Sequence, residues 1–133
     1  MTASAEQVVE RPARPAVPEP ALVAARAADA KLGQSTVVLA MGELLGVTDA
    51  FVITTGRNSR QVRTIAEEVE QRVREDTGRS PWAVEGQREL RWVLIDYGDF
   101  LVHVFHEEDR QYYDLERLWG DADRVDWKAE GTD

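Results

Sequence analysis

Asp96 and Asp99 are the acidic side chains best placed for chemistry, because they flank a Tyr97-Gly98 turn between two apolar runs. Carboxylates on neighbouring strand positions can hold Mg²⁺ against a triphosphate, and a turn such as Gly56 to Ser59 at a helix start can bind phosphate. However, Asp96 and Asp99 lie three positions apart across a turn, so they do not share one strand face. No further acid is placed to complete a metal site. Backbone hydrogen bonds by Asp99 and helix capping by the Gly56 turn explain these residues without catalysis.

The two histidines are the other candidate ligands. His103 lies inside an apolar run, and His106 lies at or past the end of that run. The chain has no cysteine and no third ligand at fixed spacing, so a zinc site is not expected. We predict that His103 is a buried, hydrogen-bonded core histidine, and we assign no role to His106.

Two apolar runs position these side chains. Trp92 to Ile95 and Phe100 to Phe105 are rich in β-branched and aromatic residues, and the tight turn between them predicts an antiparallel hairpin. Acids from Glu107 to Asp109 favour a helix start directly after the hairpin. Tyr112, Leu115 and Trp119 then follow at helical spacing.

The rest of the chain predicts a mixed α/β domain. Its order is helix, strand, strand, helix, strand, strand, strand, helix, which a mixed sheet flanked by helices on at least one face accommodates. The expected helices are 21–32, 59–77 and 107–119, and the expected strands are 36–41, 50–55, 82–85, 92–95 and 100–105. We expect a disordered proline-rich tail at residues 1–20, one domain at 21–120, and a loose acidic tail at 121–133.

Composition restricts the class of protein. The 133 residues carry a formal net charge of −9, and ten acids against four bases lie between Glu107 and Asp133. Such a surface is repelled by phosphate backbones and attracted to basic proteins, although it could serve solubility alone. No apolar run reaches the length of a membrane span, and charged residues interrupt the N-terminus where a signal peptide would be apolar. We therefore expect a cytoplasmic protein.

Three aromatic residues are candidate contacts for a partner. Trp92 shares a strand face with Leu94, opposite Val93, and is either packed in the core or presented on the far side of the sheet. Tyr97 lies at the tip of the hairpin, where a large ring is expected to touch something. Tyr113 lies one step around the helix from the Tyr112 stripe, so it should be more exposed. Exposed aromatic residues on one surface are the usual anchors of an interface.

The stretch from Trp92 to Trp119 resembles the C-terminal half of the bacterial ribosomal silencing factors, the Iojap-like family. The family pattern there is roughly W-x-x-x-D-x-G-D-x-x-V-H-V, followed by R-x-x-Y-x-L-E-x-L-W. The matching residues are Trp92, Asp96, Gly98, Asp99, Val102, His103 and Val104, then Arg110, Tyr113, Leu115, Glu116, Leu118 and Trp119. A second set comprises Thr48-Asp49, Thr55-Gly56, Ser59-Arg60, Val62 and Val84-Glu85-Gly86. These blocks occur in order and span roughly Leu22 to Trp119, so together they are a strong signal.

The resemblance implies a nucleotidyltransferase-like α/β fold and a non-enzymatic translational repressor without a cofactor. It implies binding to the large ribosomal subunit at ribosomal protein L-fourteen, which sterically blocks association of the two subunits and silences translation under nutrient limitation. It places ribosome contacts at Trp92, Tyr97 and Tyr113. Acids at Asp96, Asp99 and Glu107 are then expected to meet basic groups on the partner. A homodimer is also expected, because some family members self-associate.

Two alternative functions remain open at this point. One is a divergent nucleotidyltransferase-type enzyme acting on a small molecule or an RNA end. The other is an assembly factor for the large subunit, which binding at the same place would permit.

Overall fold

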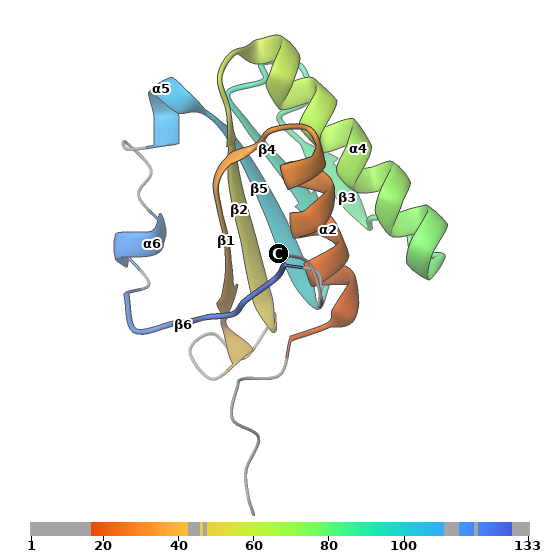
Figure 1. Cartoon of the computed structure of the whole chain (residues 1–133), viewed down its shortest axis with the longest axis vertical. Helices are drawn as coiled ribbons and strands as arrows, with labels where there is room; N and C mark the ends of the chain where they lie inside the picture. Colours follow the sequence, from red (N-terminus) through yellow and green to blue (C-terminus); the bar gives the residue numbers. More distant parts are fainter. Residues whose placement is uncertain (1–16, 43–45, 47, 111–114, 119, 129–133) are drawn as a thin grey trace, which may run out of the picture.

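A six-stranded mixed sheet forms the centre of the protein (Figure 1). The structure is a computed structural model that describes residues 17–42, 46, 48–110, 115–118 and 120–128. Its elements are α2 (Glu19–Ala30), β1 (Gln34–Ala40), β2 (Ala50–Gly56), α4 (Ser59–Thr77), β3 (Ala83–Glu85), β4 (Trp92–Asp96), β5 (Phe100–His106), α5 (Glu107–Arg110), α6 (Leu115–Leu118) and β6 (Asp123–Arg124). The strand order is β3-β4-β5-β2-β1-β6, in which β2 and β5 are parallel and every other neighbouring pair is antiparallel. The predicted α/β class with a mixed sheet flanked by helices is confirmed.

The parallel pair β2 and β5 occupies the middle of the sheet. Every residue of β2 is buried, and β5 is buried except at Leu101. Both strands are apolar at odd and even positions, which suits strands covered on both faces. The pairing of Val52 with Val102 sets their register. This pair therefore joins a core on each face of the sheet.

Helices α2 and α4 lie side by side over one face of the sheet (Figure 1). One apolar stripe of α4 is buried there (Val62, Ile65, Ala66, Val69, Val73). Alanines supply most of the buried face of α2, so the two helices approach closely. Gly56 precedes α4, and a Cβ atom at this position would lie only 2.8 Å from the side chain and the amide nitrogen of Val62. The Thr55-Gly56 motif is thus explained by the close approach of helix and strand.

The predicted hairpin is present as β4 and β5. Gly98 takes a φ of +91°, and its amide donates a hydrogen bond to the Asp96 carboxylate at 2.8 Å. The indole ring of Trp82 lies over Gly98, because a Cβ atom there would come within 2.7 Å of it. Glycine is required here both by the positive φ and by the covering ring.

The two ends of the domain differ from expectation. Helix α2 begins at Glu19 rather than at residue 21, and residues 1–16 lie outside the described part. The expected loose tail from residue 121 is wrong for residues 123–127. There β6 pairs with β1, the Val125 side chain is 5% exposed, and the Trp127 indole donates a hydrogen bond to the Thr36 carbonyl at 3.1 Å. Apolar burial by Val125 and Trp127 holds this acidic segment on the fold.

The expected last helix is seen in two described pieces, α5 and α6, and residues 111–114 between them lie outside the description. Among the described helices, none has the length and the apolar run needed to cross a membrane.

Candidate functional site

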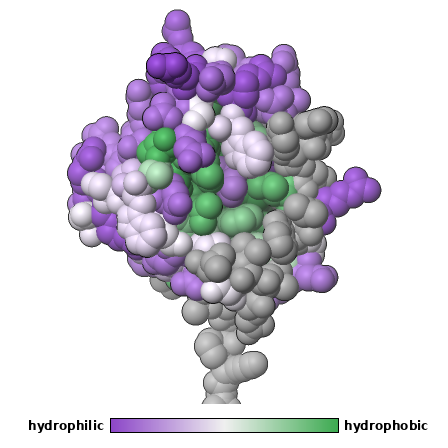
Figure 2. Space-filling model, turned by 180° about the vertical axis from the view of Figure 1, so that it is seen from behind, coloured by the Kyte–Doolittle hydropathy of each residue, from purple (hydrophilic) through white to green (hydrophobic). Residues whose placement is uncertain are grey.

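A second apolar cluster covers the sheet face opposite α2 and α4. Alternation along the strands directs one set of side chains to each face. The cluster contains buried Leu39, Met41, Phe51, Ile53 and Phe105, with partly buried Val37, Trp92, Leu101, Leu115 and Ala122 at its margin. In Figure 2 apolar side chains gather in the middle of the face seen from behind. The five buried members of the cluster are 8% exposed or less, so the partly buried members at the margin are the ones that reach solvent. We call this side of the sheet the open sheet face.

Trp92 lies on the open sheet face, opposite the buried Val93. Its side chain is neither fully buried nor fully exposed. The indole centroid lies 4.9 Å from that of Phe105, and the indole nitrogen donates a hydrogen bond to Nδ1 of His103 at 3.1 Å. Trp92 is therefore partly packed against the core and partly presented on the far side of the sheet. The ring is anchored from behind and contributes to the margin of the apolar surface.

His103 is a core histidine, as predicted. It is 5% exposed, and its ring meets that of Phe51 edge-on at 4.7 Å. Because Nδ1 accepts from Trp92, the neutral tautomer carries its proton on Nε2, which is buried and has no hydrogen-bond partner among the described residues. Burial lowers the pKa of His103 to about 4. The ring is therefore uncharged at neutral pH, which suits an apolar surface.

His106 is also buried, but its role is local. Its Nδ1 accepts a hydrogen bond from the Glu108 amide at 3.2 Å, at the start of α5. His103 and His106 are three residues apart on one strand, so alternation points their rings to opposite faces. Within the described ranges, no group of three potential metal ligands comes together.

The predicted acids fall at opposite ends of the hairpin. Asp96 and Asp99 lie at the turn, whereas Glu107 follows β5 at the end where Trp92 pairs with Phe105. Trp92 and Asp96 are four strand residues apart, a distance of about 13 Å at the rise of a strand. The structure therefore brings Glu107, and neither aspartate, to the Trp92 end of the sheet.

Asp99 is engaged by a neighbouring arginine, although its side chain is 38% exposed. Arg79 donates two hydrogen bonds to its carboxylate, at 2.7 and 3.2 Å, and a third to the carbonyl of Tyr97 at 2.8 Å. The hydrogen bond and charge of Asp99 raise the pKa of Arg79. Asp96 is likewise used by the Gly98 amide. These contacts support the interpretation that both aspartates stabilise the turn rather than hold a metal.

Glu107 stands out among the acids that begin α5. Arg91 binds its two neighbours, Glu108 at 3.0 Å and Asp109 at 2.9 Å. Glu107 is exposed and makes no hydrogen bond or ion pair with another described residue. Its charge is thus the one in this group that is available to a partner.

Tyr97, a candidate contact for a partner at the hairpin tip, is buried and touches the fold itself. Its side chain is 1% exposed, its ring stacks on Phe100 at 4.6 Å, and the Arg79 guanidinium lies 5.9 Å from the ring centroid. The turn folds the ring inward onto the helix-covered core because Phe100 and Arg79 provide a matching surface there. The exposed aromatic residue near the turn is instead Trp82, at 79%. Tyr113 lies outside the described residues.

Sequence reasoning missed the other residues of the open sheet face. Val37, Leu101 and Leu115 lie at its margin and were assigned only to elements. The signal was present in the alternation of each strand, but reading it requires knowing which strands are neighbours. The parallel pairing of β2 with β5 places Phe51 beside Leu101, and no local pattern indicates that pairing.

Comparison with known protein families shows which family the chain belongs to. The family model described as RsfS, "Ribosomal silencing factor during starvation", matches residues 14–133. The chain belongs to the RsfS family. The ribosomal silencing factor RsfS of Bacillus subtilis is 43% identical over 104 residues, which cover 78% of this chain and 87% of that protein. The RsfS of Halalkalibacterium halodurans is 42% identical over 104 residues, covering 78% and 88%.

Solved structures and a distant relative extend the comparison. A crystal structure of a protein from Chromobacterium violaceum has a TM-score of 0.72 and 32% identity, covering 77% of this chain and 84% of that one. One from Bacillus halodurans has a TM-score of 0.67 and 39% identity, covering 78% and 93%. The mouse protein named mitochondrial assembly of ribosomal large subunit protein 1 is 31% identical over 74 residues, which are 54% of this chain and 32% of that protein. The predicted family resemblance is confirmed, and the fold is that of RsfS-type structures.

Proposed function

We propose that this protein is a translational repressor that binds the large ribosomal subunit through its open sheet face and blocks association of the small subunit. The observation that carries the proposal is an apolar sheet face with Trp92 at its margin, in a member of the RsfS family. The mechanism is competition for a surface, in which occupancy depends on concentration relative to the dissociation constant. No bond is made or broken. The proposal places the protein in the cytoplasm, where the subunits meet.

The proposed partner on the large subunit is ribosomal protein L-fourteen. A net charge of −9 opposes close contact with bare RNA and favours a basic protein. Glu107, exposed at the Trp92 end of the sheet, is the acid best placed to meet a basic group at the rim of such an interface. The same apolar face could pair two copies of the chain, so a homodimer that hides it would compete with ribosome binding.

Sedimentation of separated subunits with and without the protein tests the proposal. The protein should travel with large subunits and reduce the yield of whole ribosomes when small subunits are added. If it does neither, the proposal is wrong.

Trp92→Ala sharpens this test. We expect a folded protein whose affinity for large subunits is reduced by at least about tenfold, because the variant removes an aromatic anchor from the face. Trp82→Ala is the matched control, since Trp82 is a more exposed tryptophan that lies over the hairpin turn. Equal loss in both variants would contradict a role for the open sheet face.

Assembly of the large subunit is a second candidate function, favoured by the name of the mouse relative. It predicts altered precursor particles when the gene is removed. The repressor proposal predicts normal subunits that associate too readily. Sedimentation profiles of cells lacking the gene separate the two.

A nucleotidyltransferase-type activity has weaker support, because Asp96 and Asp99 are engaged in the turn and Asn58 caps α4. Thermal unfolding with and without Mg²⁺ and nucleotide, together with a turnover assay, tests it. A thermal shift with turnover would restore the enzymatic alternative.

A further inference from the structure

The start of α4 carries positive charge in an otherwise acidic protein. Residues 56–66 contain three arginines and no acid, whereas the whole chain has a formal net charge of −9. All three, Arg57, Arg60 and Arg63, are exposed. The negative charge of the protein is therefore unevenly distributed, and this end of the helix is a local exception.

The end of α2 adds a fourth cation to the same surface. The Gln61 side chain donates to the carbonyl of Lys31 at 3.1 Å, so Lys31 lies beside the first turn of α4. Lys31 is exposed as well. We call these four residues the basic patch (Lys31, Arg57, Arg60, Arg63).

The charges of the basic patch are not neutralised by the fold. In the described part of the chain, none of the four side chains forms a hydrogen bond or an ion pair. By contrast, Arg72 farther along α4 pairs with Glu68 at 3.4 Å, and Arg79 pairs with Asp99 at 2.7 Å. The patch is thus free to bind a negatively charged partner.

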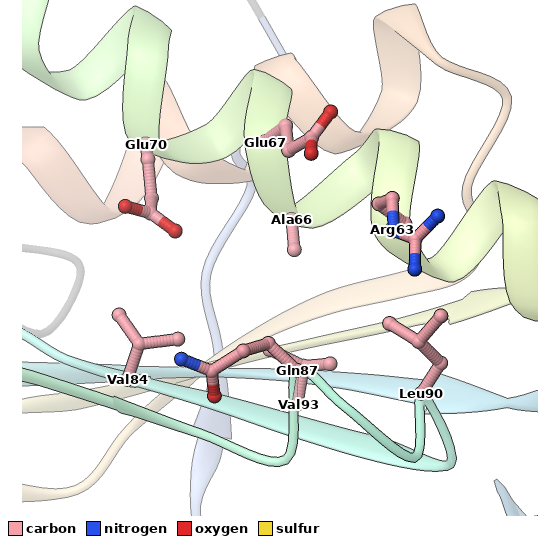
Figure 3. A pocket seen from close by; sticks show the side chains of 8 residues that line it. All are labelled: Arg63, Ala66, Glu67, Glu70, Val84, Gln87, Leu90 and Val93. Atoms are coloured by element: carbon pink, nitrogen blue, oxygen red, sulfur yellow. The ribbon is translucent and has the colours of Figure 1, made fainter.

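Arg63 extends the patch toward the loop before β4. It lines one end of a pocket between α4 and the sheet, where it lies above Leu90 (Figure 3). The acids that line the same pocket, Glu67 and Glu70, lie on later turns of the helix, and among the described side chains no ion pair joins either one to Arg63. The patch therefore ends where the acids of α4 begin.

The basic patch lies at the end of the sheet that carries Trp92. Gly56 pairs with His106 of β5, and Trp92 pairs with the preceding Phe105 from the other side of that strand. The backbones of Gly56 and Trp92 are therefore roughly 10 Å apart, which is two strand spacings. Because Arg57 follows Gly56 directly, the patch adjoins the margin of the open sheet face.

Charges of opposite sign lie on the two sides of the sheet at this end. Glu107 begins α5, on the side away from α2 and α4, whereas the basic patch lies at the start of α4 (Figure 1). A basic protein docked on the open sheet face would be attracted by Glu107 and repelled by the patch. The patch suits a negatively charged partner that lies next to that protein.

We propose that the basic patch binds the phosphate backbone of RNA in the large ribosomal subunit, beside the protein on which the open sheet face docks. This inference rests on the function proposed above and adds a second partner to it. Arginine suits phosphate because its planar guanidinium donates paired, charge-assisted hydrogen bonds to phosphate oxygens. Phosphate contacts fix the orientation of a protein without reading base sequence. The patch thus orients the protein on the subunit, and the open sheet face anchors it.

The double variant Arg57→Gln/Arg60→Gln tests the proposal through the salt dependence of binding to large subunits. Each phosphate contact contributes about one unit to the slope of log affinity against log salt concentration. We expect the variant to reduce the magnitude of this slope by about 2 and to bind at least about tenfold more weakly at low salt. The variant should fold, because both side chains are exposed and positive charge at a helix N-terminus is unfavourable.

Arg72→Gln/Arg74→Gln is the matched control, because it removes the same charge from later turns of α4. It should change the slope much less than the first variant does. An unchanged slope in Arg57→Gln/Arg60→Gln, or an equal change in the control, would overturn the proposal.

Binding to isolated ribosomal protein L-fourteen separates an RNA contact from a protein contact. Arg57→Gln/Arg60→Gln should bind the isolated protein as tightly as the unaltered chain does, whereas Trp92→Ala should bind it more weakly. An equal loss on the isolated protein and on whole subunits would assign the patch to an acidic protein segment and overturn the RNA contact. If the unaltered chain does not bind large subunits, the function proposed above fails together with this inference. If it binds but the slope does not depend on the patch, this inference fails alone.

Discussion

The hydrogen bond from Trp92 to His103 joins the most prominent residue of the open sheet face to the core. It fixes the indole on one side and makes the imidazole an acceptor at Nδ1. Protonation of His103 would place a proton on that acceptor and a charge in an apolar setting. The neutral ring is therefore part of what holds Trp92 in place.

Acid should destabilise the protein through His103. The folded pKa of about 4 is below the ordinary value of 6.5, so between these values the unfolded chain binds more protons and stability falls as pH falls. From pH 7 to pH 5 this residue should cost roughly 2 kcal/mol. Urea unfolding at both pH values, compared with His103→Gln, isolates the effect, because glutamine retains an acceptor for Trp92 and does not titrate. Equal losses in the two proteins would contradict the argument.

Tyr97 shows what single-residue reasoning cannot supply. Its place at the tip of a tight turn made the ring a candidate partner contact, but Phe100 and Arg79 enclose it. Arg79 follows α4 and lies 18 residues before Tyr97 in the chain. No local sequence pattern predicts that its side chain reaches the turn. His103 was predictable because an apolar strand surrounds it in the sequence itself.

At the scale of elements, the start of α4 is the best-defined junction. Asn58 takes an extended conformation, and its side chain accepts a hydrogen bond from the Gln61 amide at 2.9 Å. The Gln61 side chain accepts from the Arg57 amide at 2.5 Å and donates to the carbonyls of Lys31 and Leu32, each at 3.1 Å. The helix capping expected at the Gly56 to Ser59 turn is confirmed by Asn58. The tertiary use of Gln61, which ties the end of α2 to the start of α4, was not predictable.

Asn58→Ala should lower the free energy of unfolding by about 1 kcal/mol, because it leaves the Gln61 amide without its cap. Asn58→Asp should be close to neutral, since aspartate caps as well and complements the helix dipole. Chemical unfolding of the three proteins measures both. A loss as large in Asn58→Asp as in Asn58→Ala would show that the cap is not the cause.

The sequence predicted which segments form helices and strands better than it predicted which strands lie next to each other. The apolar stripe of α4 and the β4–β5 hairpin depend on periodicity and turn chemistry, which are local. The parallel pairing of β2 with β5 crosses an intervening helix and two strands, and the open sheet face exists only once that pairing is made. For this reason Trp92 could be placed on a strand face, but its degree of cover could not be predicted.

At the scale of the whole molecule, charge and apolar surface should act on different steps of binding. Long-range attraction between an acidic protein and a basic partner accelerates encounter and is screened by salt, whereas contacts of buried rings slow dissociation. Raising the salt concentration should therefore lower the association rate with large subunits, and Trp92→Ala should mainly raise the dissociation rate. Kinetic binding measurements at two salt concentrations check this. An unchanged dissociation rate in Trp92→Ala would contradict the assignment of dissociation to the apolar contacts.

The segment 123–127 connects the end of the described chain to the first helix and strand. Besides the Trp127 indole, its contacts include the Val125 amide, which donates to the Val38 carbonyl at 2.9 Å, and Arg26, which donates to the Trp127 carbonyl at 2.7 Å. Trp127→Ala should reduce stability by about 2 kcal/mol, less than for a fully buried tryptophan. Lys128→Ala, an exposed neighbour, should change it by no more than about 0.5 kcal/mol. Thermal and urea unfolding distinguish the two variants.

The same contacts have a consequence for self-association. The outward carbonyls of Thr36 and Val38 on β1 are occupied by Trp127 and Val125 of the same chain. A strand from another molecule therefore finds no free acceptors at these two positions. A chain that ended before Val125 would leave the Thr36 and Val38 carbonyls without these partners. The β1 edge of the sheet would then be free to pair with strands of other molecules and to start fibrils.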